Sequence, residues 1–158
     1  MQPPNATRCL ILACGNTLRG DDGVGHRLAE WAEDRFRQQP GVHVIARQQW
    51  TPDLAADIAA AESVLFVDCS VAAKPGHVHL VPVEPRNGAS EAATHHLDAP
   101  ELLALTHSLY GVRVAHSMLL TVGAASVEIG ETLSSPVEAA LPRARGILEK
   151  AVRRFLGN

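Results

Sequence analysis

The chain has 158 residues, 46% hydrophobic and 20% charged, which is typical of one globular domain and excludes a disordered or collagen-like chain. We therefore expect a single domain over residues 1–158, able to bury about 70% of the surface of its unfolded chain. The formal net charge of −3 lacks the basic excess that binds phosphate backbones, so nucleic acid is not an expected partner.

The cysteines and the apolar runs predict a cytoplasmic protein. The chain has three cysteines, an odd number, and no Cys-x-x-Cys pair: Cys9, Cys14 and Cys69. This favours a reducing compartment over a disulfide framework or a zinc site. The apolar run of residues 9–14 ends at Gly15 and is too short for a signal-peptide core or a membrane span. We expect a monomer that does not contact a membrane.

Apolar runs alternate with amphipathic stretches along the chain, and this alternation predicts the secondary structure. In chain order we expect a strand at 8–14, a glycine-rich loop at 15–20, a helix from 22, a strand at 42–47, a helix at 51–61, strands at 63–67 and 78–83, a loop at 84–97, a helix at 98–110, a strand at 112–122 and a helix from 135.

Several helix boundaries have specific signals. Asp98 and Glu101 have the spacing of a capping box, and Ser135-Pro136 reads as a cap followed by proline in the first turn. Pro142 lies inside the last predicted helix, where its missing N–H should kink or restart the helix.

Strands that alternate with helices predict an α/β fold, a three-layer α/β/α sandwich around a mostly parallel sheet. In open sheets of this kind the functional site lies beyond the carboxyl ends of the strands. Candidate functional residues are therefore those that follow a strand or lie in the loops at that edge.

Polar residues at that edge suit metal binding or acid–base chemistry. Asp22, preceded by Asp21, follows the first loop, Asp68 follows the third strand, and His95 with His96 lies before a helix. Two carboxylates and an imidazole suit nickel or zinc, or acid–base work on an amide. Each residue also has a structural interpretation: Asp21 and Asp22 as helix N-terminal acids, Asp68 bonded to loop amides, and His95 as a solvated loop histidine.

Other chemistry is less favoured by the sequence. Gly15 to Gly20 has the glycine spacing of a P-loop, but Asp21-Asp22 stand where a lysine and a hydroxyl are needed, so no nucleotide cofactor is expected. Cys69 is interpreted as a small buried residue and not as a thiolate nucleophile. His77 and His79 point to one face of a strand but lack a third ligand, and we interpret them as surface residues.

These motifs resemble those of the hydrogenase maturation proteases. Residues 11–25, with Gly15-Asn16 followed by Gly20-Asp21-Asp22-Gly23, look like the opening motif of that family. The apolar strand that ends at Asp68, and Thr94-His95-His96-Leu97 before a leucine-rich helix, look like its second and third motifs. The resemblance covers almost the whole chain.

The resemblance implies a fold and a ligand set. It implies a mixed sheet of about five strands with at least one antiparallel strand, in a phosphorylase/hydrolase-like sandwich. It also implies that Asp22, Asp68 and His95 contact the metal, with Asp22 and Asp68 as catalytic residues. Asp22 departs from the glutamate of many members and reaches about 1.5 Å less far.

The implied function is that of an endopeptidase that removes the C-terminal extension of a nickel-iron hydrogenase large-subunit precursor after nickel insertion. The nickel is supplied by the precursor; it would position the extension while Asp22 or Asp68 activates water. Two alternatives stay open: a metal-dependent amidase or aminopeptidase that holds its own metal, and a nickel-binding assembly factor that does not cleave.

Overall fold

The computed structural model describes residues 6–87 and 97–158. Its centre is a sheet of five strands in the order β2-β1-β3-β5-β4. The strands are β1 (Thr7–Cys14), β2 (Val42–Arg47), β3 (Ala61–Ser70), β4 (Val78–Pro82) and β5 (His116–Gly123). All neighbours pair in parallel except β4, which runs antiparallel to β5 at one edge.

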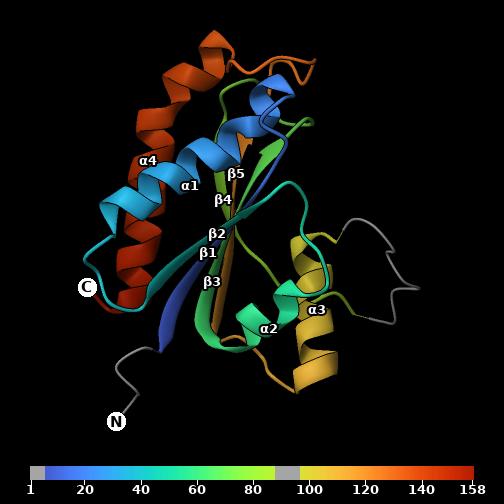
Figure 1. The fold of residues 1–158 in the computed structure, drawn as a ribbon, viewed down its shortest axis with the longest axis vertical. Coiled ribbons are helices and arrows are strands. Elements are labelled where there is room, and N and C mark those ends of the chain that lie inside the picture. The colour runs from blue at the N-terminus through green and yellow to red at the C-terminus, as the bar shows by residue number, and fades with distance from the viewer. Residues whose placement is uncertain (1–5, 88–96) are drawn as a thin grey trace.

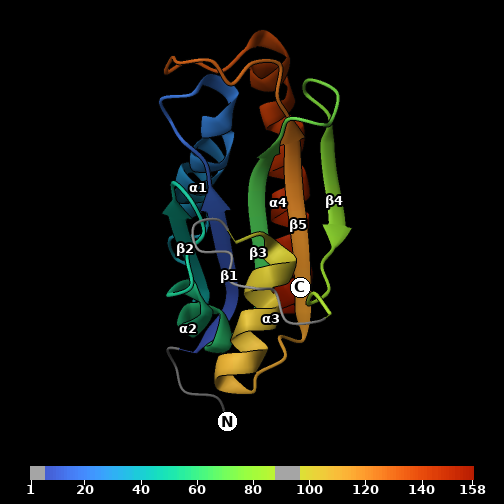
Figure 2. The same cartoon turned by 90° about the vertical axis from the view of Figure 1, so that its right-hand side faces the viewer.

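Helices cover both faces of this sheet, which confirms the predicted α/β/α sandwich (Figure 1). The helices are α1 (Val24–Arg35), α2 (Leu54–Ala59), α3 (Ala99–Tyr110) and α4 (Ser135–Leu156), and a short 3-10 helix, η1 (Gly20–Gly23), precedes α1. One face carries α1 and α4, and the other carries α2 and α3 (Figure 2). None of the helices in the described part of the chain is long and apolar enough to cross a membrane.

The sheet separates two apolar cores because strand side chains alternate between its faces. On β3, Leu65 and Val67 join the core under α1 and α4, whereas Val64 and Phe66 join the core under α2 and α3. Because β1 and β3 are buried on both faces, their sequences are continuous apolar runs. This pattern made both strands predictable.

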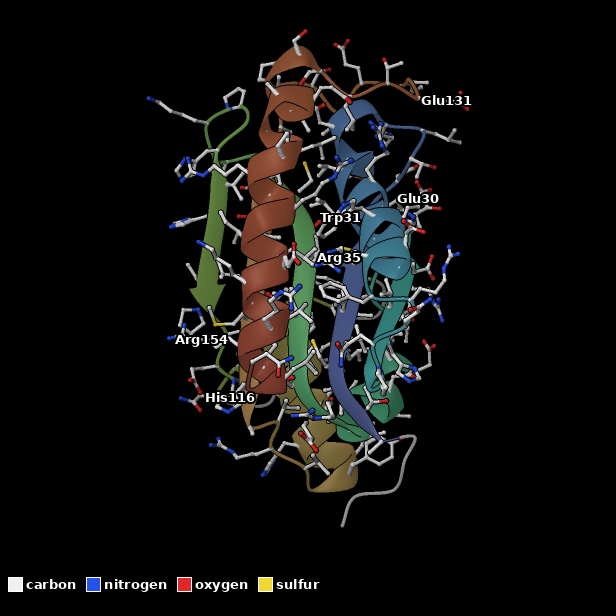
Figure 3. The ribbon with its side chains drawn as sticks, turned by 90° about the vertical axis from the view of Figure 1, so that its left-hand side faces the viewer. Glu30, Trp31, Arg35, His116, Glu131 and Arg154 are labelled. Carbon is white, nitrogen blue, oxygen red and sulfur yellow. The ribbon has the colours of Figure 1, made fainter. Side chains whose placement is uncertain are left out.

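Ion pairs join α1 and α4 across their solvent side. Figure 3 shows Arg35 of α1 directed toward α4, where its guanidinium binds Glu149, which also binds Arg153 one turn further along α4. These side chains are partly exposed, so each pair contributes only about 0–1 kcal/mol to stability. The position of α4 is therefore set mainly by its buried apolar residues.

Several predicted boundaries are wrong by a few residues. The helix expected from residue 22 begins at Val24, the strand expected from residue 112 begins at His116, and the helix expected at 51–61 covers only Leu54–Ala59. The strand expected at 63–67 extends from Ala61 to Ser70, so Asp68 lies inside it. Pairing of Asp68 with Thr121 of β5 explains that extension, because strand partners cannot be read from a single segment.

The helix termini follow their predicted chemistry with one shift. Asp98 and Glu101 form the expected capping box on α3. The N-cap of α4 is Ser134 instead of Ser135. The helix continues through Pro142 without restarting, because the carbonyl that loses its partner belongs to the exposed Glu138 and can be hydrated.

Candidate active site at the carboxyl edge of the sheet

The first loop folds back tightly at the carboxyl end of β1. A Cβ atom at Gly15, where φ is +146°, would lie 1.9 Å from the carbonyl oxygen of Asp22. Glycine therefore permits both the backbone conformation and the close approach. The turn carries the chain from β1 directly into η1, so the acids of η1 lie beside the carboxyl end of the sheet.

Asp21 is a buried anchor of the structure. Its carboxylate accepts hydrogen bonds from the backbone N–H groups of Ala125 (2.8 Å), Ser126 (3.1 Å) and Ser134 (2.7 Å), and from the Ser134 hydroxyl (2.7 Å). Burial opposes ionisation, but these bonds prevail and lower the pKa of Asp21. Asp21 therefore fastens η1 to residues 124–134, which we call the β5–α4 loop.

Asp22 is turned toward the site instead. Its Oδ2 accepts a hydrogen bond of 2.7 Å from the backbone N–H of Asn16. Among the described residues, no hydrogen bond reaches its second carboxylate oxygen. Both acids lie in the first turn of η1, as helix N-terminal acids would, but neither η1 nor α1 has a side-chain cap. Instead one acid is structural and the other is available to a ligand.

Asp68 lies on β3, next to the end of β1. Its Oδ1 accepts a hydrogen bond of 2.7 Å from the backbone N–H of Cys69, and the Cys14 thiol bonds to the same carboxyl group. Burial raises the pKa of Asp68, and the negative charge of Asp22 raises it further, against the lowering effect of those bonds. Asp22 and Asp68 therefore interact, and Asp68 binds a proton more readily than an ordinary aspartate.

The neighbouring thiols are poor nucleophiles. Burial, together with Asp22 and Asp68, raises the pKa of Cys69 to about 12, and burial raises that of Cys14 as well. Both remain protonated at neutral pH, and a thiol is far less nucleophilic than a thiolate. The interpretation of Cys69 as structural agrees with this, although its side chain is half-buried instead of fully buried.

Asp22 and Asp68 share a cleft of about 560 Å³. Its wall includes residues that sequence reasoning missed: Arg19 from the first loop, Gln48, Gln49 and Trp50 after β2, and Asp98 and Glu101 at the start of α3. The residues after β2 could have been found by the same rule that selected Asp68, because they follow the carboxyl end of a strand. A cavity of similar volume, about 570 Å³, lies around His116 and Arg154 at the opposite end (Figure 3). The cleft of Asp22 and Asp68 differs from that cavity because aspartates line its wall.

His95 lies outside the described residues, as does His96. The described chain resumes at Leu97 and Asp98, which line the cleft with Asp22 and Asp68. Within residues 6–87 and 97–158, no group of three or more histidine, cysteine, aspartate or glutamate side chains is placed to hold a metal ion. The described site therefore offers two carboxylates to a metal, and its histidine ligand stays a prediction.

The α/β/α sandwich, with interacting carboxylates at the carboxyl edge of its sheet, defines the class to which the protein belongs, that of α/β proteins whose candidate site lies beyond the strand ends. A family model, described as hydrogenase maturation protease, matches residues 26–151. The chain belongs to the hydrogenase maturation protease family, and it is a peptidase. The curated proteins contain no significant match.

Solved structures share the fold. The hydrogenase maturating endopeptidase HybD from Escherichia coli is similar with a TM-score of 0.72 at 22% identity, covering 93% of each chain. A hydrogenase 2 maturation peptidase from a Thaumarchaeota archaeon has a TM-score of 0.67 at 25% identity, covering 92% of this chain and 97% of its own. The [NiFe] hydrogenase maturation protease HybD from Thermococcus kodakarensis has a TM-score of 0.65 at 24% identity, covering 91% and 98%.

Proposed function

We propose that this peptidase removes the C-terminal extension of a nickel-iron hydrogenase large-subunit precursor after nickel insertion, and that it recognises the nickel which the precursor carries. The reaction takes place in the cytoplasm, consistent with three free cysteines. The observation that carries the proposal is the pair of interacting carboxylates, Asp22 and Asp68, in one cleft at the carboxyl edge of the sheet.

Nickel delivered by the precursor would account for two interacting acids in one cleft. Without a cation the charges of Asp22 and Asp68 repel, which contributes to the raised pKa of Asp68. A borderline dication that arrives with the substrate would relieve this repulsion and gain carboxylate ligands. Binding of the loaded precursor is then favoured over binding of the empty one. His95 is the proposed third ligand.

The two aspartates have different roles in this proposal. Asp22 has an oxygen available for the metal, while Asp68 is the proposed proton acceptor, because burial, the largest cause of its raised pKa, does not depend on the charge of Asp22. Asp68 takes a proton from water, and the resulting hydroxide attacks the carbonyl carbon of the scissile peptide. The C–N bond then breaks, and the leaving amine takes the proton from Asp68.

Loops at the carboxyl edge of the sheet provide apolar contact for a polypeptide substrate. Leu18 and Ile129 are 56% and 89% exposed, and their loops are joined by a 2.8 Å hydrogen bond from the Gly130 N–H to the Leu18 carbonyl. Val71, 76% exposed, follows β3 at the same edge. Exposed apolar residues on the loops of one edge are typical of protein contact sites.

The test is cleavage of a purified precursor, loaded with nickel or left empty, followed by mass spectrometry of the large subunit. The wild-type protein should release the extension only from the loaded precursor. Asp22→Asn, Asp68→Asn and His95→Ala should each abolish or strongly slow release. Asp57→Asn is the matched control, because it removes an exposed acid on α2 that does not line the cleft.

The same experiment separates the alternatives. Equal cleavage of the empty precursor, or cleavage of small generic peptides, would favour a protein that holds its own metal. Binding of the loaded precursor with no loss of mass would favour an assembly factor. Near-normal release by all three single variants, Asp22→Asn, Asp68→Asn and His95→Ala, would contradict the proposed site.

A further inference from the structure

A pair of histidines lies on the edge strand of the sheet, apart from the candidate active site. His77 directly precedes β4 and His79 is its second residue. Both side chains are exposed, and their ring centroids are 5.3 Å apart with an interplanar angle of 65°. The two rings are therefore neighbours with water-accessible nitrogens.

We propose that His77 and His79 form a chelating site for a late first-row dication such as Ni²⁺, Cu²⁺ or Zn²⁺. Imidazole nitrogen is a preferred ligand of these ions. With metal–nitrogen bonds of about 2.1 Å and a tetrahedral angle, the centroids of two bound imidazoles lie about 5 Å apart. The observed separation matches this value, so the two rings are spaced to bind one ion once their nitrogens turn toward it.

The backbone that carries both histidines is ordered before any ion binds. The Lys74-Pro75-Gly76-His77 turn is closed by a 3.0 Å hydrogen bond from the His77 N–H to the Lys74 carbonyl, and Gly76 has the positive φ of +76° that such a turn requires. The His77 carbonyl accepts a 2.8 Å bond from Gly123 of β5, and His79 pairs with Thr121 of β5. A chelate whose ligands stand on an ordered backbone loses less entropy on binding than one on a flexible segment.

The pair faces the same side of the sheet as Asp68. Val78 and Leu80 belong to the core under α1 and α4, so His79 between them points to the opposite face. Thr121 pairs with His79 on one side and with Asp68 on the other. At about 4.8 Å per strand, the backbones of His79 and Asp68 are about 10 Å apart along one row.

At this location the bound ion is open to solvent and to incoming ligands, unlike a buried structural metal. Figure 2 shows β4 at the edge of the sheet, with α3 lying away from the end at which β4 begins. Two protein ligands leave the remaining coordination positions to water or to an incoming group, so the ion exchanges easily. The pair thus provides an exchangeable metal site beside the carboxyl edge, and it does not depend on the proposed protease reaction.

The test is titration of the full-length, untagged protein with Ni²⁺ by calorimetry. His77→Ala and His79→Ala should each weaken association by about tenfold or more, the factor that corresponds to 1.4 kcal/mol. His43→Ala is the matched control, because His43 is a single exposed histidine on β2, the opposite edge strand. It should bind Ni²⁺ as the wild type does.

A variant that lacks the candidate active-site ligands separates the histidine pair from that site. In a variant with Asp22→Asn, Asp68→Asn, His95→Ala and His96→Ala, Ni²⁺ binding at the histidine pair should persist. Electron paramagnetic resonance with Cu²⁺ should show two nitrogen ligands in this background, and one after His79→Ala is added. Loss of all binding in the background, or unchanged Ni²⁺ affinity in both His77→Ala and His79→Ala, would overturn the proposal.

Discussion

The β5–α4 loop and the cleft that contains Asp68 each receive one member of the same Asp-Asp pair. Asp21, on the loop side, is fully buried and accepts four hydrogen bonds. Asp22, on the cleft side, accepts one, from the Asn16 N–H. The pKa of Asp21 is lowered because its donors outweigh burial, whereas burial and a neighbouring charge raise the pKa of Asp68 in the cleft.

This difference separates stability from function within a short segment. A carboxylate whose lone pairs are filled by protein donors is fixed and stabilising, and it has little capacity left for a ligand. Carboxylates with few donors and a like charge nearby are electrostatically unsatisfied, which is typical of functional sites. Substitutions in the cleft should therefore change mainly activity, and substitutions at the Asp21 anchor should change mainly stability.

The largest expected effect is on activity, in the cleft. Asp68→Asn should lower the rate of precursor cleavage by about 10²- to 10⁴-fold, because it removes the proposed proton acceptor. The free energy of unfolding should change by no more than about 1 kcal/mol, since burial already disfavours the charge. Cleavage kinetics and denaturant unfolding check both values. A protein that is strongly destabilised would show that Asp68 is structural.

Asp21→Asn should have the opposite effect, lowering the stability of the fold more than the rate of cleavage. It replaces a carboxylate that receives four hydrogen bonds by an amide whose NH₂ group faces donors, so we expect a loss of about 3 kcal/mol of unfolding free energy. Urea unfolding measures this loss, and Asp57→Asn again provides the control for a lost charge. An effect below about 0.5 kcal/mol, the size of an ordinary surface substitution, would contradict the anchoring role.

The same anchor predicts how stability depends on acid. The pKa of Asp21 is lower in the folded protein than its ordinary value of 3.8, so its ionised form stabilises the fold above that value. This contribution is lost as the pH falls from about 3.8 through the folded pKa, with a slope of at most about 1.4 kcal/mol per pH unit. Unfolding measured between pH 5 and about pH 2.5 should show a shallower loss for Asp21→Asn than for the wild type. Parallel curves would contradict the shift.

The smallest expected effect concerns one of the four bonds. Ser134→Ala removes the hydroxyl that donates to Asp21 Oδ2 and should cost about 1 kcal/mol. Ser135→Ala is the matched control, because that neighbouring serine is exposed and starts α4 without binding Asp21. Thermal unfolding of the two variants side by side gives the comparison. Equal losses would place the effect in the helix start and not in the anchor.

Local patterns were sufficient for most of the architecture. Buried parallel strands appear as continuous apolar runs, which identified β1 and half of β3, and the capping box fixed the start of α3. The rule that sites lie at the carboxyl ends of strands selects Asp22 and Asp68 from the sequence alone. The same rule was applied too narrowly at β2, where Gln48 and Trp50 also line the cleft.

The sequence by itself determined the α/β layering, the family motifs and the acidic character of the carboxyl edge, because these depend on periodicity and on residues close together in the chain. Only the tertiary structure decided which of Asp21 and Asp22 is the anchor. The donors to Asp21 come from residues 125–134, more than a hundred positions away. Such a contact depends on how β5 and α4 pack against η1, and that information is spread over the whole core.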